Sequence, residues 1–221
     1  VEKLKKIYKD TNVTISFLNN NPIDLFWDDQ PIYPNSIAFL QEEKYAGESA
    51  TNKIKKIQNL LKRNLIDYYL LNSLDSIAWL LNLRGNDIKY TPLNFANLII
   101  PQNGKIELFI DINKVKSNLK YLNTFARIHP FDYLDDFIEN IDLKKNIGFD
   151  ENSVPYHYKN ISQNIGLEIK NFENPCLYFK ATKNKIELAG ARKANQRDGV
   201  SVTNFLYWLK NQIVIEETNE I

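Results

Sequence analysis

The sequence predicts an α/β fold, with a sheet covered by helices on its faces and one long helix after it. Three observations support this prediction. Helical and strand-like segments alternate between residues 48 and 171, an Asn-Gly pair separates two apolar runs, and a helical pattern begins near Lys183. A chain of 221 residues is long enough to bury a core and to hold one full domain plus parts of others.

The first clear helix spans Glu48 to Asn64, because Ile54, Ile57 and Leu61 recur at helical spacing. Lysines and an arginine surround this apolar stripe, and we interpret them as a solvated face; they are Lys53, Lys55, Lys56, Lys62 and Arg63. A strand over 66–71 follows, and then a short apolar helix that is capped by Ser73 or Asp75 and runs through Leu83 to a turn over 84–87. The remaining expected strands span 95–101, 106–110, 125–129, 146–149 and 167–171. The remaining expected helices of this region lie near 113–122, over 131–138 and near 155–165.

The turn between the strands Phe95 to Pro101 and Ile106 to Ile110 contains Asn103 and Gly104. An Asn-Gly pair between apolar runs is the strongest local hairpin signal, because both residues tolerate the positive φ angles of a tight turn. The sequence therefore predicts that these two strands pair antiparallel.

The two ends of the chain differ from its middle. Leu4 to Phe17 suggests a helical turn and a strand, and the prolines after it indicate an extended connection; they are Pro22, Pro31 and Pro34. From Lys183 onward a long helix is expected, with Asn184 as its cap and Glu187 completing a capping box. Gly190 and Gly199 inside it predict close packing or a break. We expect an exposed apolar face on this helix, formed by Leu188, Phe205, Leu206 and Trp208.

Composition excludes several classes of protein. The 28 basic and 27 acidic residues balance to a net charge of +1, which is not typical of a nucleic-acid-binding chain. The longest apolar runs are far shorter than the roughly 18 residues of a membrane helix, so we expect no membrane partner. The lone Cys176 cannot form an internal disulfide, and a signal-peptide pattern is missing at the start, so we expect a reducing, cytoplasmic location.

Conventional catalytic and cofactor motifs do not occur. His129 and His157 lie outside the spacings of zinc sites, and Cys176 is interpreted as a half-buried, inert thiol. Gly-rich phosphate loops are missing, and the aromatic residues do not alternate with lysines as nucleic-acid stacking platforms do. We therefore assign no catalytic residue, metal ligand or cofactor to this chain from residue patterns.

One exposed turn does combine charge with flexibility. An apolar helix leads into Arg84, Gly85 and Asp87. The guanidinium of Arg84 is suited to hold a carboxylate with two hydrogen bonds, and Asp87 offers one nearby. Two interpretations remain open: a salt bridge that stiffens the turn, or a surface that contacts a ligand or a neighbouring domain.

Four further segments occur in a fixed order along the chain. The first is Asn21-Pro22-Ile23-Asp24-Leu25-Phe26-Trp27-Asp28-Asp29-Gln30-Pro31, and the second is Lys44-Tyr45-Ala46-Gly47-Glu48-Ser49. The third runs from Asp75 to Asp87 and on through Thr91-Pro92. The fourth is Lys180-Ala181-Thr182-Lys183-Asn184 with Glu187, Arg197-Asp198-Gly199 and Phe205-Leu206-Tyr207-Trp208-Leu209. These segments, in this order, resemble the three-domain aminopeptidase P (Xaa-Pro aminopeptidase) family, in which an Arg is usual at the position of Gln30.

The resemblance implies a division of the chain into four parts. Residues 1–20 would end a first creatinase-N-like domain, 21–34 would link it to the next, and 35–175 would form a complete creatinase-N-like middle domain with a mixed sheet. Residues 176–221 would open a pita-bread catalytic domain that the chain does not complete. The absence of Met and the first residue, Val1, also favour a segment of a longer protein.

The resemblance implies a metallopeptidase that releases the residue preceding a proline. Family members use two divalent metal ions, usually manganese, bound by two Asp, one His and two Glu, all of which would lie beyond this chain. We therefore expect the chain alone to be inactive, to bind no metal, and to contribute structure, subunit association and the active-site rim, with Arg84, Gly85 and Asp87 as candidate rim or domain-interface residues.

The expected partners are the missing catalytic domain, or a second chain that carries it, and another copy in a homodimer. Proline-containing peptides would be substrates of the complete protein. Two alternatives remain: a non-catalytic module that binds peptides or proteins, and a truncated remnant of a peptidase gene.

Overall fold

A mixed β-sheet forms the centre of the molecule in the computed structural model, which describes Leu4, residues 7–16, Leu18 and residues 21–212. Within these residues the strand order of the main sheet is β6-β5-β4-β2-β7-β8. The strands are β2 (Tyr68–Leu71), β4 (Asn97–Pro101), β5 (Ile106–Phe109), β6 (Ala126–His129), β7 (Asn146–Phe149) and β8 (Glu168–Asn171). β4 pairs antiparallel with β2 and with β5, whereas the other three ladders are parallel. The predicted α/β class and hairpin are confirmed.

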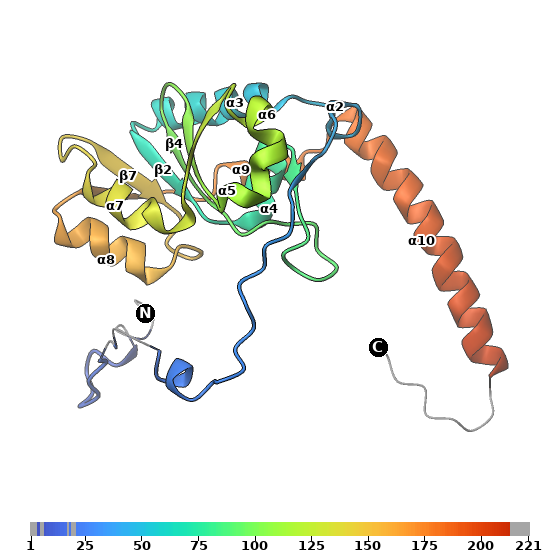
Figure 1. Cartoon of the computed structure of the whole chain (residues 1–221), viewed down its shortest axis with the longest axis horizontal. Coiled ribbons are helices and arrows are strands. Elements are labelled where there is room, and N and C mark those ends of the chain that lie inside the picture. The colour runs from blue at the N-terminus through green and yellow to red at the C-terminus, as the bar shows by residue number, and fades with distance from the viewer. Residues whose placement is uncertain (1–3, 5–6, 17, 19–20, 213–221) are drawn as a thin grey trace.

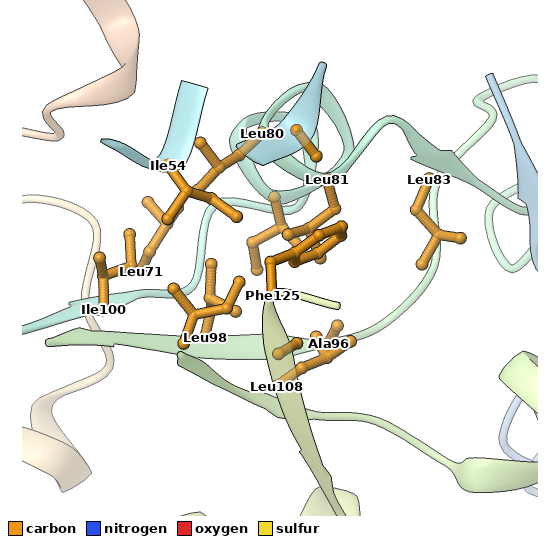
Figure 2. Packing of buried hydrophobic residues seen from close by; sticks show 14 of the residues in the cluster. Ile54, Leu71, Leu80, Leu81, Leu83, Ala96, Leu98, Ile100, Leu108 and Phe125 are labelled. Atoms are coloured by element: carbon orange, nitrogen blue, oxygen red, sulfur yellow. The ribbon is translucent and has the colours of Figure 1, made fainter. Parts of the chain in front are cut away.

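Helices cover both faces of this sheet and create two apolar clusters (Figure 1). On one face, α3 (Ala50–Arg63) and α4 (Leu74–Leu81) pack over the sheet. Figure 2 shows this cluster, in which side chains from the helices meet those of β2, β4 and β5; it labels Ile54, Leu71, Leu80, Leu81, Leu83, Ala96, Leu98, Ile100, Leu108 and Phe125. On the other face, α7 (Leu134–Glu139) and α8 (Tyr156–Asn164) enclose the second cluster. Side chains alternate between the two clusters along β2, as the two-residue period of a strand requires.

The short apolar helix ends earlier than the sequence suggested. α4 stops at Leu81, because Asn82 takes the left-handed conformation with φ of 51° and ends the helical hydrogen bonding. Leu83 and Arg84 then form β3 (Leu83–Arg84), which pairs antiparallel with β1 (Phe39–Leu40). The prediction of a helix through Leu83 and of a turn beginning at Arg84 was therefore wrong.

Other differences concern short elements. The helix expected near 113–122 is divided into α5 (Ile112–Val115), η2 (Lys116–Asn118) and α6 (Leu119–Leu122), and the one over 131–138 is η3 (Phe131–Tyr133) followed by α7. The sequence did not predict α2 (Glu43–Ala46) and α9 (Cys176–Ala181). Helices of four to six residues contain too few apolar positions to show a period.

α10 (Lys185–Asn211) projects from the rest of the molecule next to α2 (Figure 1). Asn184 and Glu187 form the predicted capping box. Gly190 and Gly199 lie in continuous helix with open space around them, so the expectation of close packing or a break was wrong. The apolar face is exposed as expected, since Leu188, Phe205, Leu206 and Trp208 are between 42% and 51% accessible.

At the other end, η1 (Pro22–Leu25) is followed by an extended segment that leads to β1 (Figure 1). Residues 7–16 contain no strand, so the strand suggested within 4–17 is not formed there, and positions 5, 6 and 17 lie outside the described residues. Among the helices of the described part of the chain, none has the length and apolar character needed to span a bilayer.

Candidate functional site

Asp87 is held by four hydrogen bonds at the end of the turn that follows β3. Its Oδ1 accepts from the amide N and the hydroxyl Oγ of Ser36, at 3.2 and 2.6 Å. Its Oδ2 accepts from the amide N of Phe95 at 2.8 Å and from Nζ of Lys114 at 2.6 Å. The Asp87 and Lys114 side chains are 0% and 3% exposed, so this is a buried ion pair. Asp87 therefore joins its own loop to Ser36 and Lys114, which lie 51 and 27 residues away in sequence.

The electrostatics at Asp87 favour the ionised carboxylate. Burial alone would raise its pKa, but hydrogen bonds from Lys114, Ser36 and Phe95 together hold the pKa below its usual value. A salt bridge between Arg84 and Asp87, one of the two interpretations left open by the sequence, does not form, because each side chain takes other partners. Lys114, whose side chain supplies the counter-charge, was missed, since nothing local in the sequence relates it to a residue 27 positions earlier.

Arg84 points its guanidinium back to the helix that precedes it. Nη1 donates to the carbonyl oxygens of Ala78 and Leu83, the latter at 3.0 Å. Burial lowers the pKa of Arg84, and the carboxylate of Glu187 opposes this effect. Gly85 is required by a close contact, because a Cβ at this position would lie 1.9 Å from Nδ2 of Asn94. Asn94 is itself buried, and both polar atoms of its amide lack a partner among the described residues.

Lys53 on α3 is buried next to Arg84 and was wrongly predicted to be solvated. Its side-chain Nζ donates to the carbonyl of Trp79 at 2.9 Å and to Oδ1 of Asn82 at 2.8 Å, and it lies 4.5 Å from the centre of the Trp79 ring. Burial lowers the pKa of Lys53 to about 8, with Glu187 acting in the opposite direction. The signal in the sequence was that Lys53 lies four residues before Ile57, which places it on the buried face.

A cleft of about 950 Å³ separates this region from α10. Its walls come from α2, α4, the loop over 91–93 and the first turns of α10, and Arg84 and Lys53 both line it. Basic side chains outnumber the acidic Asp75 and Glu187 along the walls; they are Lys44, Lys53, Arg84, Lys180, Lys183, Lys185, Lys193 and Arg197. The cleft is therefore positively charged and suited to an anionic group.

The remaining candidate residues lie away from this cleft. His129 Nε2 is 2.8 Å from Oε2 of Glu107, and its ring stacks against Phe109 and Tyr133. His157 pairs with Asp135 on the surface, at 2.7 Å. Each histidine thus has a structural partner.

Cys176 is fully buried rather than half-buried, and burial raises the pKa of its thiol to about 12. A thiol in this state is almost entirely protonated at neutral pH, so it is a poor nucleophile. In the described ranges no three His, Cys, Asp or Glu side chains come together as potential metal ligands.

Comparison with known proteins shows similarity over nearly the whole chain. Residues 29–187 match the model of the creatinase/prolidase N-terminal domain family. The sequence is 33% identical to Xaa-Pro aminopeptidase 1 of Dictyostelium discoideum and 32% identical to a probable Xaa-Pro aminopeptidase P of Aspergillus flavus, with 99% and 96% of this chain covered. The chain spans about a third of the length of these relatives, 36% and 34% respectively.

Comparison with solved structures shows that the fold is also similar to that of an aminopeptidase. The fold superposes on X-prolyl aminopeptidase from Caenorhabditis elegans with a TM-score of 0.83 and 26% sequence identity. The superposition covers 96% of this chain and 35% of that enzyme, which is described as cytosolic with a di-nuclear active site.

Proposed function

This chain belongs to the creatinase/prolidase N-terminal domain family, and we propose that it forms the middle domain and the first catalytic-domain helix of an Xaa-Pro aminopeptidase. The family match ends at residue 187, whereas the likeness to the C. elegans enzyme covers 96% of the chain and so includes most of α10. This continuation past the end of the domain is the observation that carries the proposal. The boundaries that we propose are 1–20, 21–34, 35–175 and 176–221.

The proposed reaction is release of an N-terminal residue that precedes proline, with two divalent metal ions, manganese in this proposal. Such ions activate water and stabilise the developing oxyanion only when their ligands surround them. The described residues do not fit such a centre, because His, Cys, Asp and Glu side chains do not gather in groups of three or more among them. The ligands would therefore come from the part of the relatives that this chain does not match.

Within that enzyme, the chain would supply structure and one wall of the substrate entrance. Arg84 lines the positively charged cleft and is the rim residue of the proposal, whereas Asp87 and Gly85 shape the turn that presents it. The exposed apolar face of α10 would pack against the rest of the catalytic domain, because side chains such as Phe205 and Trp208 are half exposed here. A homodimer and a cytoplasmic location complete the proposal; the single buried thiol of Cys176 is consistent with the latter.

The test is cleavage of a short Xaa-Pro peptide with manganese present. The chain is assayed alone and mixed with a separately expressed segment that carries the family's metal ligands, and that segment alone is the control. Activity that appears only in the mixture is the expected result. Activity from the chain alone would overturn the placement of the ligands, and an inactive mixture with a confirmed complex would favour a non-catalytic binding module.

A substitution in the active mixture tests the rim. Arg84→Gln should raise KM for the peptide more than it lowers kcat, because the residue would contact substrate away from the reacting bond. Lys62→Gln, an exposed change on α3, is the matched control. Equal kinetics for the two variants would remove Arg84 from the rim.

A further inference from the structure

The direction of α10 depends on very few contacts. None of its 27 residues is buried, and its main packing partner among the other elements is the four-residue α2. A helix of this length extends about 40 Å at 1.5 Å per residue. A small change of angle at its first turn is therefore amplified along the helix: a 10° rotation moves the far end by roughly 7 Å.

Asn184 connects the start of α10 to α2 with a single side chain. Its Oδ1 accepts from the backbone N of Ile186 at 2.9 Å and of Glu187 at 3.0 Å, which caps the helix. Its Nδ2 donates to the carbonyl of Ala46 at 2.8 Å, across 138 residues of sequence. The same amide thus caps α10 through its oxygen and binds the end of α2 through its nitrogen.

The Asn184 amide packs directly against the backbone of Gly47. It ends α2 with φ of 71°, a conformation that favours glycine, and a Cβ built on it would lie 2.3 Å from Oδ1 and 2.7 Å from Nδ2 of Asn184. Backbone shape and lack of a side chain are both needed here. Gly166 has a similar φ of 78° but nothing within 4 Å of its would-be Cβ, so it isolates the backbone effect.

We propose that Asn184, seated on Gly47 and bonded to Ala46, is a positioning residue that sets the direction of α10 relative to the sheet domain. A further step rests on the proposed function: the contacts of Asn184 with Gly47 and Ala46 also fix the angle at which the catalytic domain joins the middle domain. Two segments of the sequence, Lys44 to Ser49 and Lys180 to Asn184, are then two halves of one joint.

The experiment measures the distance between spin labels on cysteines introduced by Lys62→Cys on α3 and Asn204→Cys on α10, both exposed positions. Labelled chains are diluted with an excess of unlabelled chain, so that only distances within one chain are recorded even if α10 mediates self-association. The native Cys176 is buried and stays unlabelled. The variants, each in this labelled chain, are Asn184→Asp and Gly47→Ala, with Gly166→Ala as the matched control. Aspartate keeps the oxygen that caps the helix but replaces the donor to Ala46 with a charged acceptor. This variant therefore removes the hydrogen bond to α2 while it keeps the helix cap.

We expect one narrow distance distribution in the parent chain and in Gly166→Ala, and a distribution shifted or broadened by about 5 Å in Asn184→Asp and Gly47→Ala, with helix content by circular dichroism unchanged. This displacement follows from a 10° rotation about 19 residues from the start of the helix. A broad distribution in the parent, or the same distribution in all four chains, would overturn the proposal. Neither result depends on peptidase activity, so a failure of the proposed function would be seen separately in the peptide assay.

Discussion

Removing the two partners of the buried Asp87–Lys114 pair should destabilise the protein unequally. Asp87→Ala leaves the Lys114 ammonium buried without a counter-charge and leaves the donors of Ser36 and Phe95 without an acceptor. Loss of one partner from a buried pair costs about 3–5 kcal/mol. Lys114→Met keeps three of the four hydrogen bonds to the carboxylate, so its expected cost is smaller, about 1–3 kcal/mol.

Urea unfolding followed by circular dichroism measures both costs. The control is Lys44→Ala, because Lys44 pairs with Glu42 at a similar distance of 2.8 Å but both side chains are about 60% exposed. Exposed pairs contribute little to stability, because solvent screens the two charges. In a thermal scan, a loss of 4 kcal/mol corresponds to a decrease in Tm of roughly 8–16 °C for a chain of this size. An equal loss of stability in Lys114→Met and Asp87→Ala, or a loss in neither that exceeds the control, would contradict the unequal effect expected here.

The pH dependence follows from the lowered pKa of Asp87. Because the folded pKa lies below the unfolded value of about 3.9, the stabilisation is fully present above roughly pH 4 to 5 and is lost as the pH falls through the folded pKa. The difference in unfolding free energy between the parent and Asp87→Ala should therefore be constant from pH 5 to pH 7 and decrease only in stronger acid.

Three further predictions concern single groups. Cys176 should react with a thiol reagent at pH 8 only after unfolding, because at a pKa of about 12 only about one thiol in ten thousand is ionised; rapid native labelling would contradict its burial. Lys53 has a folded pKa of about 8, below the unfolded value of about 10.4, so the free energy of unfolding should rise between these pH values by up to about 3 kcal/mol. Urea unfolding at pH 7.5 and pH 9.5 should show this rise in the parent chain and not in Lys53→Met. The same change with pH in both chains would refute the assignment. The chain should self-associate through α10, because the apolar face of this helix is exposed. In sedimentation experiments, a double variant carrying Phe205→Ser and Trp208→Gln should associate less than the control variant Lys210→Ala. A parent chain that stays monomeric at all concentrations would contradict this.

Strong local patterns predicted the main elements to within about two residues. The helix expected from Glu48 to Asn64 is α3, whose N-cap is Ser49, and the Asn-Gly turn joins β4 to β5 as expected. These elements depend on period and turn chemistry, both of which are readable from neighbouring residues. The capping box at the start of α10 belongs to the same class.

Features that depend on distant residues were not predictable in this way. Asp87 looked like a partner of Arg84 because the two lie close in sequence, yet its partners Ser36 and Lys114 lie 51 and 27 residues away. Asn82 gave no sign that it would be left-handed and end α4 early. Lys53 was misplaced because a lysine was assumed to be solvated, although its spacing from Ile57 put it on the buried face.

The position of β2 has a consequence for synthesis of the protein on the ribosome. In the finished sheet β2 lies between β4 and β7, and Asp67 and Asn146, which flank the β2–β7 ladder, are 79 residues apart. At about 5–20 residues per second, β7 emerges roughly 4–16 s after β2. Until then β4 can protect only one side of β2, and the apolar segment Tyr-Tyr-Leu-Leu remains an open edge to which another nascent chain can pair. A strand from the centre of the native sheet is thus accessible for seconds during translation, which is when chaperone binding would matter most.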